Sequence, residues 1–254
     1  MKKQILYTLF GIMISTSLWA QEYKVAKSTG KLDIKEVGDV SIVGYTGKEV
    51  IFSSRSYTRD RDDRAKGLRA VSSMGLEDNT GLGLSVVDNN GTIEIRQLRK
   101  MNGPDVIIKV PQGMVIKYAH TSPHGSDLKI SDVAGEIDVS TVHNDVELEN
   151  VTGIVRVRTV HGDINASFAG EIKNVVSISS THGHVDVALP ASTKGDLKLS
   201  TTWGEIFVDP ALNLEMNKSG DFVRYSDRME AKLNGGGTEI SLSSTHDNVY
   251  LRKK

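Results

Sequence analysis

Histidine closes a short repeated motif in this sequence, and histidine is the residue best suited to bind metal or move protons near neutral pH. The motif has seven residues, with apolar residues at the first and third positions and His or Trp at the last. Rings repeated along one edge could share a metal ion or titrate as a group. The five copies end at His143, His161, His182, Trp203 and His246.

The spacing of the copies decides whether these rings meet. The copies begin at residues 137, 155, 176, 197 and 240, so they are 18, 21, 21 and 43 residues apart. Alternating Val, Ile and Leu predict short strands with one buried face. Gly, Asn or Asp at the corners tolerates a tight turn. The last interval is about two periods long and predicts a degenerate copy near Asp221–Ser226.

Two topologies fit strands of this length. An antiparallel meander would make neighbouring strands equivalent at every turn. Here the equivalence is clearest between alternate strands, 18–21 residues apart. That pattern is typical of a solenoid, whose coils stack about 4.8 Å apart and bury one continuous core. The sequence therefore favours an all-β fold, a right-handed β-solenoid similar to a β-helix, with the meander as the alternative.

The rest of the chain is strand-like but less regular. A hairpin is expected at Asp88–Gly91, and a solvated charged insert at residues 54–80. We expect one elongated β-solenoid domain over residues 21–254, irregular over 21–117 and regular over 118–254. The strands expected in the irregular part are Lys31–Ile34, Val40–Val43, Glu49–Ser53, Leu82–Val87, Thr92–Arg96 and Asp105–Val110.

The rings are expected to stack at a solvent-facing corner rather than to hold a metal ion. Trp203 would interrupt the column, and no Asp or Glu recurs beside it at ligand spacing. We therefore predict no metal site. If the stacked imidazoles protonate together, the stability of the fold should decrease as the pH is lowered. The candidate binding surface consists of His143, His161, His182, Trp203 and His246, together with Arg158.

Acidic and hydroxyl residues also recur near the turns. The acidic ones could bind Ca²⁺ or supply an acid–base pair for sugar hydrolysis. They fall on different columns and edges, and the glycine-rich calcium nonapeptide is missing, so turn roles are favoured. The hydroxyls share the phase of buried positions and are expected to satisfy backbone groups at the corner. The acidic residues are Glu136, Asp145, Asp163, Asp196, Glu205 and Asp221, and the hydroxyl residues are Thr141, Thr159, Ser180, Thr201 and Ser244.

Composition excludes several classes of function. The chain has 254 residues and no Cys, which excludes disulfides, thiolate metal sites and thiol catalysis. Its formal net charge of −1 lacks the basic excess of a generic nucleic-acid binder. The sequence contains no phosphate-binding glycine loop, no G-x-S-x-G elbow and no H-E-x-x-H motif. We expect no catalytic residues, no cofactor and no nucleic-acid partner.

The first twenty residues predict export. Lys2 and Lys3 precede an apolar run from Ile5 to Trp19, which ends at Ala20. A basic start, a short apolar stretch and a small final residue are typical of a secretory signal peptide, here residues 1–20. The stretch is short for a membrane span, and no second run of spanning length follows. After cleavage we expect no membrane span and a location in the periplasm, the outer cell envelope or the extracellular space.

Several segments carry a resemblance to a known family. They are Asp105–Gly113 (DVIIKVPQG), the turns Val133–Ile137 and Glu149–Gly153, and the closing segments Leu233–Gly237 and Ser244–Leu251. The chain resembles the bacterial putative-adhesin family catalogued as domain of unknown function 4097, from about Lys31 onward. The resemblance implies a β-solenoid protein of the cell envelope. It implies no active-site residues, because that family has no agreed catalytic motif.

Together these features predict an exported, non-enzymatic β-solenoid that presents a repetitive surface to a glycan or to an envelope or surface protein. One alternative is a polysaccharide-active enzyme on a β-helix scaffold, which a cleft of paired carboxylates would favour. Another is a periplasmic structural or signalling partner, docked through an uncapped end of the solenoid.

Overall fold

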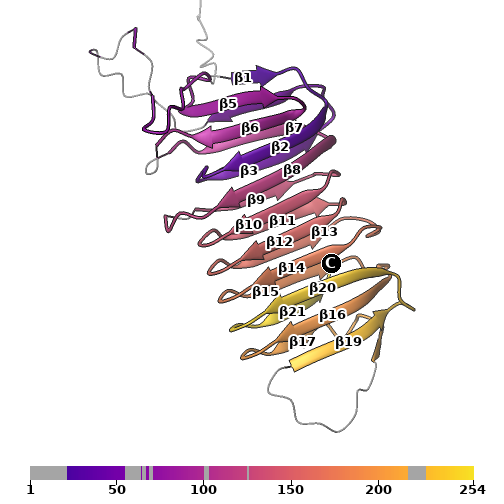
Figure 1. Cartoon of the computed structure of the whole chain (residues 1–254). Helices are drawn as coiled ribbons and strands as arrows, with labels where there is room; N and C mark the ends of the chain where they lie inside the picture. The colour runs from indigo at the N-terminus through magenta and orange to yellow at the C-terminus, as the bar shows by residue number, and fades with distance from the viewer. Residues whose placement is uncertain are drawn as a thin grey trace, which may run out of the picture.

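The computed structural model describes residues 22–54, 64, 67–68, 71–99, 103–124, 126–216 and 227–254. The regular elements in those ranges are strands. They form two facing sheets, and the coils of the chain are stacked along one long axis (Figure 1). The expected signal peptide and part of the charged insert lie outside the described residues.

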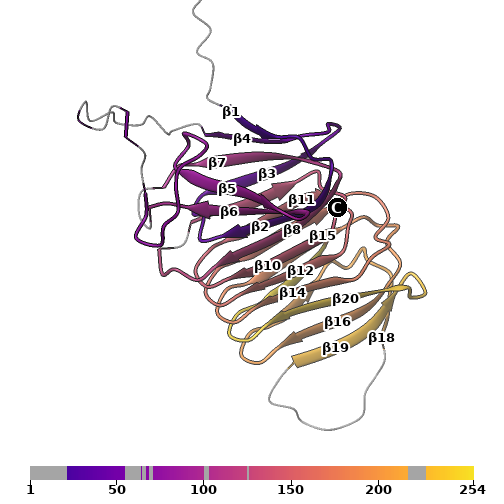
Figure 2. The same cartoon turned by 45° about the horizontal axis from the view of Figure 1, so that its top comes forward.

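Sheet A has ten strands and sheet B has eleven. In spatial order, sheet A consists of β1 (Glu22–Val25), β4 (Val50–Ser54), β7 (Val106–Pro111), β3 (Val40–Tyr45), β9 (Leu128–Ser131), β11 (Val146–Val151), β13 (Ile164–Phe168), β15 (Val185–Leu189), β21 (Val249–Lys253) and β17 (Ile206–Val208). Sheet B consists of β5 (Leu84–Asn89), β6 (Thr92–Gln97), β2 (Thr29–Lys35), β8 (Gly113–His120), β10 (Ile137–Thr141), β12 (Val155–Thr159), β14 (Val176–Ser180), β20 (Thr238–Ser244), β16 (Gly195–Thr201), β19 (Asp227–Leu233) and β18 (Leu214–Met216) (Figure 2).

Most neighbouring strands pair in parallel, one coil apart. Ile137 of β10 pairs with Val155 of β12, which pairs with Val176 of β14. This register places equivalent repeat positions over one another, so Val, Ile and Leu form buried columns between the two sheets. The predicted β-solenoid is therefore confirmed, and the antiparallel meander is wrong.

The coils do not stack in the order of the sequence. The last coil, β20 with β21, lies between the coil β14–β15 and the coil β16–β17. The first coil, β2 with β3, is likewise held between β6–β7 and β8–β9. Both terminal coils are therefore internal, and Figure 1 shows the C-terminus inside the stack. The degenerate copy expected at Asp221–Ser226 lies outside the described residues.

Antiparallel strands close both ends of sheet B and one end of sheet A, whereas the other edge strand of sheet A, β17, pairs in parallel with β21. β19 pairs with β16 and β18 at one end of sheet B. At the other end β5 pairs with β6 through the expected hairpin, where Asn90 and Gly91 have φ of 46° and 99°. β4 and β1 extend sheet A in the same antiparallel way. Such strands end the parallel repeat and blunt the edge against further stacking. The six strands expected in the irregular part are confirmed as β2 to β7.

Candidate functional site

A column of five rings runs along the corner where sheet B turns into sheet A. We call His143, His161, His182, His246 and Trp203 the corner column. The ring centroids of consecutive histidines are 4.8, 4.7 and 4.6 Å apart, and their planes differ by 19°, 5° and 5°. All five residues are exposed, Trp203 at 74%. Because the last coil is inserted, His246 follows His182 and Trp203 stands beyond it. The expectation that Trp203 interrupts the column is wrong.

Buried hydroxyls hold each corner in place, as expected from their phase. Ser180 Oγ donates to the carbonyl of Gly162 in the coil below at 3.0 Å and accepts the N–H of Gly183 at 2.9 Å. Ser244 Oγ makes the same pair of bonds one coil further, to the Gly183 carbonyl and from the Asp247 N–H. Each hydroxyl therefore ties its own turn to the turn below. The rings outside these turns are held at matching heights and angles.

The stacked geometry suits face contacts rather than chelation. Two imidazoles that share one zinc ion each place a nitrogen about 2.1 Å from it, with both lone pairs aimed at that point. The near-parallel rings of His161, His182 and His246 direct their lone pairs side by side instead. The column offers flat ring faces at its end and polar ring edges along its length.

The stacked neighbours predict a stability that depends on pH. Desolvation and the adjacent His246 and His161 lower the pKa of His182 below its ordinary value of 6.5. The unfolded chain therefore takes up a proton that the folded chain resists, and stability should fall as pH drops below about 6.5. We expect a lower melting temperature at pH 5.5 than at pH 8, with a smaller difference in His182→Gln. Identical pH dependence in the two proteins would contradict this role of the column.

Arg158 lies on the outer face of sheet B, three residues before His161. Its register neighbours are Ser140 on one side and Ser179 on the other. Arg156, on the same strand, is neutralised by Glu136, whereas Arg158 is exposed and makes no ion pair with any described residue. The guanidinium of Arg158 therefore lies beside the corner column without an ion-pair partner in the described part of the chain.

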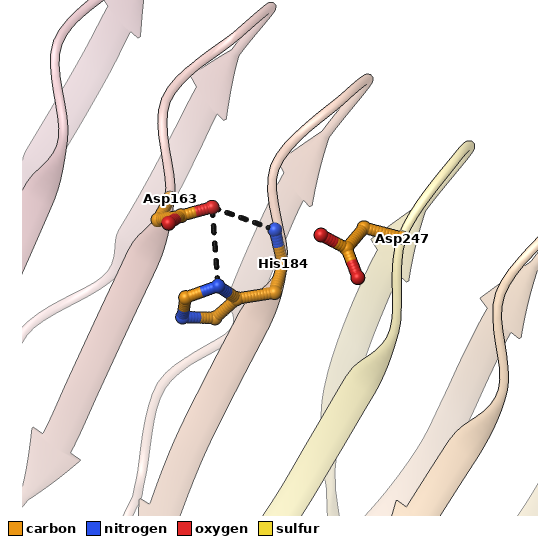
Figure 3. Close-up of side chains that lie close together, drawn as sticks. All are labelled: Asp163, His184 and Asp247. Carbon is orange, nitrogen blue, oxygen red and sulfur yellow. Dashed lines mark hydrogen bonds and ion pairs between the residues drawn. The ribbon is translucent and has the colours of Figure 1, made fainter.

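A second cluster, which the sequence analysis did not single out, lies on three spatially successive turns. Figure 3 shows Asp163, His184 and Asp247, whose candidate ligand atoms all lie within 4.8 Å of one another. Asp163 Oδ1 accepts the backbone N–H of His184 at 2.9 Å and lies 3.1 Å from its Nδ1. Nε2 lies 3.3 Å from Asn165 Oδ1. Both ring nitrogens of His184 therefore face oxygen atoms of neighbouring side chains, and a cation at this cluster would compete with these contacts.

The acidic residues at the start of the sheet A strands share one column. Asp145 Oδ1 accepts the N–H of Asp163 at 2.8 Å, as Asp163 does for His184, so these carboxylates bridge successive coils. Of the acidic residues singled out above, Asp145, Asp163 and Glu205 belong to this column, Glu136 and Asp196 lie at the opposite edge, and Asp221 is outside the described residues. The expectation that they fall on different columns is thus only partly correct. In spatial order the column contains Asp105, Asp39, Asp127, Asp145, Asp163, His184, Asn248 and Glu205.

Comparison with known families decides the classification. The sequence profile of the Toastrack DUF4097 family matches residues 112–252, which is more than half of the chain. The chain belongs to the Toastrack DUF4097 family. The Toastrack match spans β8 to β21 and includes every ring of the corner column. The resemblance drawn from the turns and the closing segment is therefore confirmed.

The Toastrack chain also resembles solved structures at low similarity. A putative cell adhesion protein from Clostridium sporogenes is 13% identical, with a TM-score of 0.46 over 92% of this chain and 100% of that chain. A putative adhesin from Bacteroides fragilis is 11% identical, with a TM-score of 0.31 over 94% and 98%. These values are too low to support an argument about function. No curated protein matches the chain. Within the described residues, no helix has the length and apolar character needed to cross a membrane.

Proposed function

We propose that this Toastrack protein is an exported, non-enzymatic binding protein of the adhesin type, which presents the corner column to a glycan or protein ligand. The observation that carries the proposal is the stack of four exposed histidine rings, with the exposed Trp203 one coil beyond it. Polar ring edges repeated from coil to coil, with a flat ring face at the end of the stack, suit shallow contacts with sugar rings or with apolar side chains. Export is supported by the signal-like first twenty residues, and the adhesin type by the family resemblance.

One observation favours a second candidate, a polysaccharide-active enzyme. Asp39, Asp105 and Asp127 line a surface depression of about 420 Å³ together with Lys129 and Glu147. Neighbouring coils are about 4.8 Å apart, close to the separation of carboxyl groups in retaining glycosidases. However, a carboxylate oxygen of the equivalent Asp145 and Asp163 accepts a hydrogen bond from a backbone N–H of the next coil. That repeated bond is a structural role, so binding is the better supported function.

Trp203→Ala tests the proposed surface. We expect the variant to bind at least about fivefold more weakly in a printed panel of glycans and extracellular-matrix proteins, because an exposed aromatic contact is worth about 1 kcal/mol or more. The melting temperature should not change, since Trp203 is 74% exposed. Phe207→Ala is the matched control, because Phe207 is an exposed ring of the same coil on another face. Equal binding by Trp203→Ala and wild type would overturn the proposal, as would the release of new reducing ends from a polysaccharide in the panel.

Protease treatment of intact and permeabilised cells tests the location. Degradation on intact cells would support a surface adhesin. Survival on intact cells with loss after permeabilisation would contradict adhesion and favour a partner within the envelope.

A further inference from the structure

One outward-facing column of sheet B carries only positive charge. Its members pair in register from strand to strand, so they form a straight line across nine strands. Four are basic and none is acidic. We call this line the basic column: in spatial order it consists of Arg96, Lys35, Ala119, Ser140, Arg158, Ser179, Ser243, Ser200 and Arg228.

The neighbouring outward column has a different charge pattern. It lies two residues earlier on the parallel strands and mixes three basic with four acidic residues. The segregation of charge is therefore a property of one column and not of the whole face. This mixed column consists of Glu94, Asp33, Lys117, Asp138, Arg156, Ser177, Ser241, Lys198 and Glu230.

The positive charges of the basic column are sparse and in part unpaired. Arg228 contacts Glu230 at 3.1 Å and Lys35 contacts Asp33 at 2.8 Å, both from the mixed column. Arg96 and Arg158 make no ion pair with any described residue. With strands about 4.8 Å apart, Arg158 lies about 14 Å along the column from Lys35 and about 19 Å from Arg228. The residues between them are Ser or Ala.

Short side chains leave a depression on this face beside Arg228. Ser200, Ser243 and Ser241 line a depression of about 470 Å³ together with Lys198 and Arg228. Its floor offers hydroxyl groups, which donate and accept hydrogen bonds. The depression reaches Thr202 and Thr245, the residues directly before Trp203 and His246. The basic column therefore borders the corner column.

We propose that the basic column binds a linear acidic polysaccharide, laid along the solenoid axis with its carboxylate or sulfate groups at the arginines. This rests on the proposed binding function and names its ligand class. Guanidinium groups form paired hydrogen bonds with carboxylate or sulfate oxygens, and the serines between them match sugar hydroxyls. A nucleic acid is less favoured, because the chain has a formal net charge of −1 and lacks the basic excess of a generic nucleic-acid binder.

Binding of the purified chain to defined polysaccharides tests this inference. We would titrate it by calorimetry with heparin and with polygalacturonate, using neutral dextran as the control, at 50 mM and 200 mM salt. Both acidic polymers should bind, dextran should not, and affinity should fall with salt. Arg158→Gln should weaken binding about fivefold, and Arg158→Gln with Arg228→Gln more, since exposed ion pairs contribute up to about fivefold each. Arg156→Gln is the matched control, because it removes the same charge from the same strand but from a neutralised pair.

Several results would overturn the inference. They are no binding to either acidic polymer, equal binding to dextran, tighter binding to single-stranded DNA, or equal losses in Arg156→Gln and Arg158→Gln. Unchanged melting temperatures would show that the variants are folded. Suppose that Trp203→Ala weakens binding to a neutral glycan or a protein, while Arg158→Gln does not weaken binding to either acidic polymer. The proposed function then stands and the acidic ligand is rejected.

Discussion

A chain that stops after Gly237 is expected to lose its folded structure rather than to fray at one end. The truncation removes β20 and β21, which lie between β14–β15 and β16–β17. Ile240, Leu242, Val249 and Leu251 are fully buried in that coil. Burying each side chain contributes about 1.5–3 kcal/mol, so the loss of about 6–12 kcal/mol is comparable with the total stability of a domain.

The topology sets this expectation apart from that of an ordinary solenoid. In a solenoid built in sequence order, losing the last coil exposes one interface and leaves the others intact. Here the loss of the last coil opens a gap inside the stack and exposes two interfaces between coils. Circular dichroism and thermal melting should show loss of the cooperative transition. The control stops after Arg252 and removes only the exposed Lys253 and Lys254. A cooperative melt of the shorter chain within a few degrees of wild type would contradict the inserted arrangement.

The repeat predicted which strands are equivalent but not their order in space. Val176 pairs with Ile240, although Leu197 is the next copy along the chain. The copies share the same apolar positions, so any two coils can bury each other equally well. The repeat positions therefore do not encode the spatial order of the coils. The 43-residue interval is the available signal, but it predicts a degenerate copy near Asp221–Ser226 and not the insertion of the last coil.

The same limit explains what was predicted of the surface and what was not. The corner column follows from the seven-residue motif alone, because each ring lies two residues after a buried Ser or Thr, as His182 does after Ser180. The basic column does not, because Arg228 comes from an antiparallel strand and Lys35 from the inserted first coil. Of the acidic residues that share a column at the start of the sheet A strands, the sequence singled out only Asp145, Asp163 and Glu205, and it did not predict that they share one column. Asp39 and Asp105 occupy the same register position, but a long and irregular segment separates them in sequence.

Gly162→Ala is expected to cost about 3 kcal/mol of unfolding free energy, at the upper end of the usual effect of overpacking. A Cβ at Gly162 would overlap the carbonyl oxygen of Asn144 in the coil below. Neither side can yield, because Asn144 is fully buried and Gly162 is fixed by two hydrogen bonds. Its N–H donates to Thr159 Oγ1 at 3.1 Å, and its carbonyl accepts from Ser180 Oγ at 3.0 Å.

Urea unfolding measured by circular dichroism tests this expectation. Gly38→Ala is the control, because the nearest atom to its added Cβ would be Gln97 Oε1 at 3.8 Å, an ordinary contact. The midpoint should shift in Gly162→Ala and stay in place in Gly38→Ala. Equal midpoints would mean that the coils can separate locally at little cost. The ring of His161 could then leave the stack, because the same turn holds both residues. A shifted midpoint would show that the close approach of the glycine corners, together with the buried hydroxyls, holds the corner column in register.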